Sequence, residues 1–288
     1  MDAVLLGVLA GALFGAMTVA VRWGLVRGGD PVVGAATVIT IAFTAGALLA
    51  LPTIADETDS GDLLRFFAIG ALVPGVSQIV FTYAVRAAGP SRAAILFGTA
   101  PLLSVLLALA LLDEPFEPAL IVATALVVAG GVVLAAERRR PVDFRVVGVA
   151  FALACAVLFA LRDNAVRWVA RDADVPALQA SAASLLAAAL VTVAFAVATR
   201  RSELQRALRV ALPSFAPAGL LFGLAYAALV TAFDRGRVGI VAPLNATQSL
   251  WGILFAALFF HRSEAIGRRT VVAGLLVVAG GAIVGVVR

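Results

Sequence analysis

Long apolar stretches alternate with short polar breaks along the whole chain. Each stretch is about 20 residues long, which is the length that a helix needs to cross the hydrocarbon core of a bilayer. No stretch shows the two-residue alternation that predicts the strands of a membrane barrel. The pattern therefore predicts an all-α membrane protein with ten transmembrane helices, at 3–25, 32–51, 63–85, 91–112, 119–136, 146–169, 177–198, 213–233, 239–260 and 270–287.

Two segments of the chain occur twice. The segment Leu126–Gly131 recurs letter for letter at Leu276–Gly281, and Leu13–Trp23 resembles Leu158–Trp168; the offsets are 150 and 145 residues. An odd number of spans in each half turns the second copy upside down, and inverted repeats are typical of secondary transporters. We therefore predict two inverted five-helix repeats, 1–136 and 146–288, joined by a basic linker, 137–145.

The amino-acid composition argues against several classes of function. Hydrophobic residues make up 62% of the chain, and the net charge of +5 comes from arginines scattered at helix ends, so we expect no nucleic-acid partner. All 22 basic residues are arginine, whereas the phosphate-binding loop of an ATP-driven pump needs a lysine. One cysteine, Cys155, and one histidine argue against a disulfide framework or a metal site. We expect neither a metal nor a cofactor.

Polar side chains inside the spans are the candidates for a site, because they are costly in a bilayer and usually face a cavity or the bundle interior. One stripe in the ninth span is Asn245, Gln248, Ser249 and Gly252. A second, beside Pro74-Gly75 in the third span, is Ser77, Gln78, Phe81 and Thr82. A third, in the eighth span, is Gly219, Phe222, Gly223 and Tyr226. Such stripes either bind a substrate or form hydrogen bonds and core contacts between helices.

From these stripes we predict that one central cavity is lined by the substrate-binding residues Gln78, Phe81, Tyr226, Asn245 and Gln248. The first span also carries glycines at a spacing of four, Gly7, Gly11 and Gly15. Small residues at this spacing let helix backbones approach closely. This second pattern predicts packing and does not concern the substrate.

Asp163 is the candidate for coupling transport to a proton, since it is the one acid placed well inside a predicted span. Arg162 beside it and Arg167 four residues on leave two other interpretations open. The arginines could form a site for an anion or carboxylate. Alternatively, Asp163 and Arg167 could form an i,i+4 ion pair near the end of the helix, with their charges reaching the membrane surface.

The chain resembles the drug/metabolite transporter superfamily in its ten-helix form with two EamA-type domains. The resemblance lies in Pro101, Asp113-Glu114 and Val127–Gly131 of the first half, and in Glu264 and Gly280-Gly281 of the second. Glu114 and Glu264 each precede a glycine by sixteen residues. The chain departs from the family where Phe14-Gly15 replaces the usual Trp-Gly. Its first span has no acid, so the proton coupling of the small four-helix relatives does not carry over.

Orientation in the membrane stays open. Fourteen arginines lie on one side of the predicted topology and seven on the other, which places both termini outside by the positive-inside rule. The family resemblance implies both termini in the cytoplasm.

The repeat and the resemblance together predict a transporter in the cell membrane and not an enzyme. We expect a secondary active exporter or exchanger of a small polar or amphipathic metabolite, working by alternating access. The predicted partners are the substrate, the lipid bilayer and a proton or another coupling ion, with the chain a monomer or a homodimer. The alternatives are a channel-like facilitator, or a membrane-embedded transferase that uses the loop acids Asp56, Asp59 and Asp62 to hold a metal.

Overall fold

The computed structural model of the chain describes residues 3–56, 58–100, 102–104, 107, 118–135, 145–170, 173–235, 241, 244–245, 247–260 and 267–287. The described residues form helices and contain no strand. Six helical stretches are long and apolar enough to cross a membrane: Ala3–Val26, Pro31–Thr53, Ser60–Ala88, Val147–Val166, Ala177–Arg200 and Leu204–Arg235. The all-α prediction is confirmed, and the count of ten spans stays a prediction.

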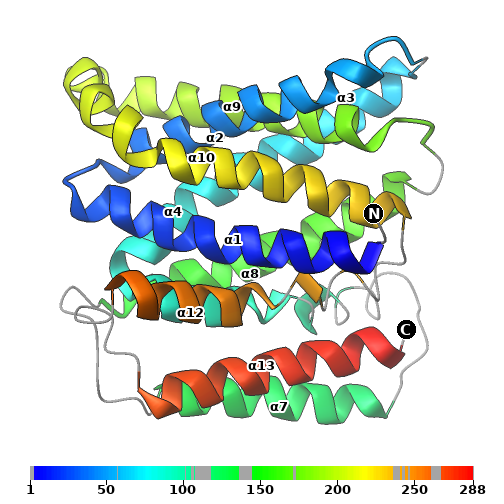
Figure 1. Cartoon of the computed structure of the whole chain (residues 1–288), viewed down its shortest axis with the longest axis vertical. Coiled ribbons are helices and arrows are strands. Elements are labelled where there is room, and N and C mark those ends of the chain that lie inside the picture. Colours follow the sequence, from blue (N-terminus) through cyan, green and yellow to red (C-terminus); the bar gives the residue numbers. More distant parts are fainter. Residues whose placement is uncertain are drawn as a thin grey trace.

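The helices of the first half are α1 (Ala3–Val26), α2 (Pro31–Ala50), α3 (Ser60–Gly70), α4 (Ser77–Ala88), α5 (Pro90–Phe97) and α7 (Ala119–Ala135). Short helical turns, η1 (Leu51–Thr53) and η2 (Ala71–Val76), follow α2 and join α3 to α4. The second half contains α8 (Val147–Ala170), α9 (Ala177–Arg200), α10 (Leu204–Arg235), α12 (Gln248–Phe260) and α13 (Arg268–Val287). Their axes run side by side, with α7 and α13 together at one edge (Figure 1).

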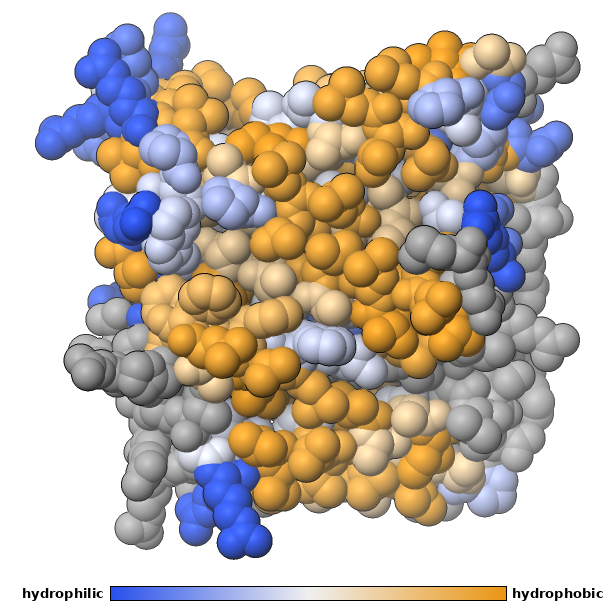
Figure 2. Space-filling model, in the orientation of Figure 1, coloured by the Kyte–Doolittle hydropathy of each residue, from blue (hydrophilic) through white to orange (hydrophobic). Residues whose placement is uncertain are grey.

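Apolar side chains cover the middle of the helix bundle on the face shown in Figure 2, and hydrophilic ones gather at the helix ends. Large apolar residues such as Leu190, Leu258 and Phe259 are more than half exposed. Exposed apolar surface of this extent would aggregate in water but is solvated by lipid tails. The surface therefore has the pattern of a membrane protein.

Local sequence signals set several helix ends. The carboxylate of Asp30 caps α2 by accepting from the backbone N–H groups of Val32 and Val33, and Pro31 occupies the first helical position. Gly89, with φ of 83°, separates α4 from α5 and is followed by Pro90. A residue with a side chain would be strained at this φ, which explains why the turn uses glycine.

The start of α10 differs from the prediction. The helix begins at Leu204, nine residues before the predicted boundary at 213, so the predicted gap between the spans 177–198 and 213–233 is wrong in its second half. The segment from Leu204 to Arg209 consists of strong helix formers, which continue the helix beyond the apolar stretch. At 32 residues, α10 is about 48 Å long and extends beyond a core about 30 Å thick.

The helix contacts are paired between the two halves. α1 packs against α10, and in the same way α8 packs against α4. α2 packs against α9, α5 against α12 and α7 against α13. An inverted repeat makes α1 equivalent to α8, α2 to α9, α4 to α10, α5 to α12 and α7 to α13. The contact between α1 and α10 then corresponds to the one between α8 and α4, and each of the other three contacts joins two equivalent helices. This pattern is the one expected of two repeats related by a two-fold axis.

Candidate transport site

A pocket lies where the two halves meet, between α1, η2, α4, α8, α10, the start of α12 and the segment before it; it contains about 400 Å³ of empty space, part of it open to the surroundings. The first half contributes Phe14, Met17, Val73, Pro74, Ser77, Gln78 and Phe81. The second half contributes Phe159, Arg162, Phe222, Asn245 and Gln248. Its walls are mostly apolar, with a few polar groups that converge from several helices. This is the usual composition of a small-molecule site.

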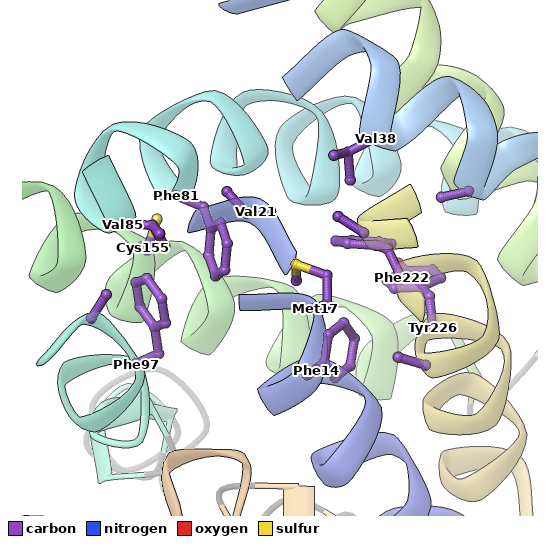
Figure 3. Close-up of a cluster of buried hydrophobic side chains, with 14 of the residues drawn as sticks. Phe14, Met17, Val21, Val38, Phe81, Val85, Phe97, Cys155, Phe222 and Tyr226 are labelled. Atoms are coloured by element: carbon purple, nitrogen blue, oxygen red, sulfur yellow. The ribbon is translucent and has the colours of Figure 1, made fainter. Parts of the chain in front are cut away.

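Aromatic rings form much of the wall. Figure 3 shows Met17 and Phe14 on α1, near Phe222 of α10. The rings of Phe14 and Phe222 meet edge to face at 5.6 Å. On the other side, Phe81 stacks on Phe97 at 4.7 Å. Aromatic contacts of this kind restrict the positions of the rings, so the wall holds a defined shape.

Two amides in the cavity have atoms without partners. Gln78 is 2% exposed, and its Nε2 has no hydrogen-bond acceptor among the described residues. Asn245, from the second half of the chain, has no donor to its Oδ1 within the described part of the chain. A buried polar atom without a partner costs about 1–3 kcal/mol, and such atoms need an explanation in a native structure. Both residues line the same cavity, where a ligand can satisfy these atoms.

A buried ion pair borders the cavity. Arg162 donates from Nε and Nη2 to Asp163 Oδ1, at 3.0 and 2.8 Å. The side chains are 9% and 7% exposed. Arg162 lines the cavity and Asp163 does not. The guanidinium also lies 5.3 Å from the centre of the Phe159 ring.

The structure brings four of the five predicted binding residues to this cavity: Gln78, Phe81, Asn245 and Gln248. Tyr226 is not among the lining residues. It is buried, and its ring stacks on that of Phe222 at 5.9 Å. Asp163 pairs with Arg162 instead of reaching the membrane surface. The side chain of Arg167, the other predicted partner, lies outside the described residues.

The rest of the predicted polar stripes serves packing. Ser249, on the stripe with Gln248, donates to the backbone oxygen of Ala94 in α5. Thr82 donates to the backbone oxygen of Gln78 within its own helix. Gly219 and Gly223 lie against Ile41 and Ala42 of α2. Each stripe is thus divided between the cavity and contacts within its own helix or with a neighbouring one.

Helix breaks occur next to the cavity. Val73 has extended φ and ψ angles of −137° and 111° at the junction of α3 and α4, and Pro74, which lacks an N–H, follows it. A turn at Gly98–Thr99 follows α5, and a turn at Thr247 precedes α12. The hydroxyls of Thr99 and Thr247 donate to the backbone oxygens three residues earlier, at 2.7 and 2.6 Å. Discontinuous helices are a common feature of transporter binding sites.

The glycine stripe of α1 positions one wall of the cavity. A Cβ on Gly11 would lie 3.2 Å from the backbone oxygen of Asn245, and one on Gly15 would lie 3.0 Å from that of Gln248. The backbones therefore touch directly at the two residues that present their amides to the cavity. The stripe, predicted to serve packing alone, sets the position of both amides.

Sequence reasoning did not predict several residues that line the cavity, among them Phe14, Met17 and Phe159, and it considered Arg162 only as part of an anion site. The repeat contained a signal for these four. Its alignment places Phe14 opposite Phe159 and Met17 opposite Arg162, at the matching point of each half. Residues that face one another across a two-fold axis near the midplane are placed to line a central site.

A family model decides the wider assignment. The model of the EamA-like transporter family matches residues 1–136 and 146–286. The chain belongs to the EamA-like transporter family. This confirms the resemblance to the drug/metabolite transporters, and it makes the chain a multi-pass membrane protein of a family of transporters, not of enzymes. The fold agrees with a protein known from a crystal structure, at a TM-score of 0.65 and 23% identity over 98% of this chain and 95% of that one. No curated protein matches the chain.

Within this EamA-like chain, the loop acids of the transferase alternative have local roles. Asp59 caps α3 by accepting from Gly61 N, and Asp62 pairs with Arg65 at 3.0 Å on the surface. No group of three or more His, Cys, Asp or Glu side chains that could hold a metal occurs in the described ranges. Asp113, Glu114 and Glu264, which carried part of the resemblance, lie outside those ranges.

Proposed function

We propose that this chain is a secondary transporter that binds one small amphipathic metabolite in the central cavity and exposes it in turn to each side of the membrane. The observation that carries the proposal is the pair of unpartnered amide atoms, Gln78 Nε2 and Asn245 Oδ1, in one cavity. They come from different halves of the chain. A solute that satisfies both would hold the halves together, and release would free them to separate.

Alternating access fits the arrangement of the helices. In the proposal the two halves are inverted five-helix repeats, as the paired helix contacts support. The cavity lies between them, so a rocking movement of one helix group against another can open it to either side. The movement needs no nucleotide, in agreement with the absence of lysine from the sequence. Export and exchange are both compatible with this movement.

Asp163 is the proposed coupling residue. It is buried, and Arg162 is its ion-pair partner. A buried carboxylate that loses its partner is strongly disfavoured in the charged form, so a change at Arg162 can be answered by proton uptake. Asp163→Asn should then abolish uptake driven by a proton gradient and spare equilibrative exchange. Unchanged accumulation by the variant would remove Asp163 from the coupling role.

Transport by the purified chain in proteoliposomes tests the proposal. A screen over amino acids, sugars, nucleobases and amphipathic ions, with and without a proton gradient, should identify a saturable substrate. Gln78→Leu and Asn245→Leu should each reduce its uptake at least about tenfold, as expected when a hydrogen bond of about 1.5 kcal/mol is lost. Thr82→Val, one turn from Gln78 but bonded within its own helix, is the control and should transport normally. Equal uptake by all four proteins would refute the site.

A further inference from the structure

The Arg162–Asp163 ion pair presents its positively charged member to the cavity. Arg162 lines the cavity, whereas Asp163 lies behind it, so the cavity meets the positive end of the pair. Both hydrogen bonds from the guanidinium go to one carboxylate oxygen, through Nε and Nη2. Nη1 has no acceptor among the described residues. A guanidinium can form bidentate bonds along more than one edge, so the edge that contains Nη1 is still available to an acceptor.

A second donor belongs to the same cavity. Gln78 Nε2, on α4, is buried and lacks an acceptor in the described part of the chain. α4 packs directly against α8, which carries Arg162. An ionised carboxylate is acceptor-only and has about four lone-pair sites on two oxygens, so it can accept from both donors at once. A neutral amide also has an acceptor oxygen, but without the charge its hydrogen bonds to a guanidinium are weaker, and an amine would place donors against donors.

The other residues that line the cavity indicate the chemistry of the rest of the ligand. Phe14, Phe81, Phe159 and Phe222 surround the cavity with aromatic surface. Asn245, which also lines the cavity, offers one acceptor at its Oδ1. The complementary molecule has an anionic group at one end, an apolar or aromatic body, and a hydrogen-bond donor that reaches Asn245.

We propose that the cavity selects small organic acids, with the carboxylate bound by Arg162 and Gln78 and the apolar body held between the phenylalanines. The assignment rests on the proposed transport function and names the substrate class of the same site. The charged pair belongs to the second repeat alone, because Met17 and Thr18 occupy the matching positions of the first repeat. The charge is present in one half only, so the ligand binds in one orientation.

The first repeat also suggests a variant that removes both charges without leaving either one unpaired. Arg162→Met alone would leave Asp163 buried and unpaired, at a cost of about 3–5 kcal/mol, and the protein could fail to fold. Combining Arg162→Met with Asp163→Thr copies the first repeat and removes both charges together. Asp163→Asn instead keeps the cation and removes its competitor. Elution profile and melting temperature would establish that each variant is folded.

Binding of three matched probes tests the assignment: 3-phenylpropionate, 3-phenylpropionamide and 3-phenylpropylamine, measured by ligand-induced shifts in melting temperature of the purified chain. We expect the natural chain to bind the acid at least about tenfold more tightly than the amide, because hydrogen bonds to charged groups contribute about 1.5–3 kcal/mol. The double variant should bind acid and amide equally. Asp163→Asn should bind the acid more tightly still.

Opposite outcomes separate the two proposals. Preference for the amine, lost in Asp163→Asn, would show that Asp163 binds a cation and would overturn the assignment. Equal binding of acid and amide by the natural chain would overturn it too, yet leave the cavity as the site. If no probe binds, the substrate from the uptake screen decides: an uncharged or cationic substrate overturns the assignment. Uptake that is insensitive to Gln78→Leu would instead refute the transport site itself.

Discussion

Gly130 of α7 and Gly280 of α13 contact each other's helix in the same way. A Cβ on Gly130 would lie 2.8 Å from Val277 Cγ2 and 2.9 Å from the oxygen of Ala273; one on Gly280 would lie 2.7 Å from Val127 Cγ2 and 2.8 Å from the oxygen of Ala123. Every contact is repeated at an offset of 150 residues. Higher numbers on one helix meet lower numbers on the other, so the helices are antiparallel. A two-fold axis perpendicular to both helices produces this arrangement, as expected for inverted repeats.

This reciprocity predicts matched effects of Gly130→Ala and Gly280→Ala. Each new methyl group would press on a backbone oxygen of the other helix, and overpacking of this kind costs about 1–3 kcal/mol. Both variants should lower the melting temperature by similar amounts. Ala279→Val, at an exposed position of α13, is the control and should melt like the natural chain. A large effect of one glycine and none of the other would contradict the two-fold packing.

Without substrate, the unpartnered amide of Gln78 should be a source of instability. Gln78→Leu removes a buried Nε2 that lacks a partner, so the variant should be more stable than the natural chain by about 1 kcal/mol or more, although it loses transport. Thermal unfolding without substrate measures the first effect and proteoliposome uptake the second. Ser249→Ala should lower stability and leave transport unchanged, because the Ser249 hydroxyl donates to the backbone oxygen of Ala94 and serves packing. It should lose about 0.6 kcal/mol and keep its substrate affinity.

Gly15 should matter more to transport than Gly7, although both belong to the same stripe. A methyl group on Gly15 would lie 2.8 Å from the backbone nitrogen of Gly252 and 2.6 Å from Trp251 Cβ, and would displace the segment that carries Gln248. On Gly7 it would lie 3.2 Å from Leu244 Cβ, a contact that a shift of a few tenths of an ångström relieves. Gly15→Ala should reduce initial uptake rates about tenfold or more, and Gly7→Ala only slightly. Equal rates for both would show that the stripe does not position the amides.

Asp30 gives a prediction that concerns stability alone. Its carboxylate caps α2 through two backbone N–H groups and also pairs with Arg200 of α9 at 3.0 Å. Asp30→Ala loses both interactions and should cost about 1–2 kcal/mol. Asp30→Asn keeps the cap and loses only a partly exposed ion pair, worth at most about 1 kcal/mol. Chemical unfolding of the two variants should therefore separate them; equal losses would assign the effect to the ion pair.

Apolar length predicted where helices occur but not how they are interrupted. α1, α2 and α9 begin and end within two residues of the predicted limits, because a bilayer requires about 20 apolar residues for each span. Turns at Gly98–Thr99 and Thr247 depend on local hydrogen bonds of threonine hydroxyls, which hydropathy does not register. α10 starts early because helix propensity continues where hydropathy ends.

The polar residues inside the apolar spans predicted some of the residues that line the cavity. Gln78, Asn245 and Gln248 were predicted because an amide inside a bilayer is costly and needs a reason. Phe14 and Phe159 were missed, since a phenylalanine in an apolar helix is equally suited to lipid, core and cavity. Tyr226 shares a helix face with Phe222, and only the packing shows that Phe222 lines the cavity while Tyr226 does not. Helix faces can be read from one sequence; the choice among residues on a face depends on their neighbours.

Access to the cavity from the two sides of the membrane tests the central claim most directly. Cys155 is the single cysteine, so Cys155→Ala gives a background without thiols, and Ser77→Cys places one on the cavity wall with a change of one atom. A membrane-impermeant maleimide should label the Ser77→Cys protein in proteoliposomes from either side, and the transported substrate should protect it from both. Labelling from one side only, with and without substrate, or from neither side, would contradict alternating access through this cavity.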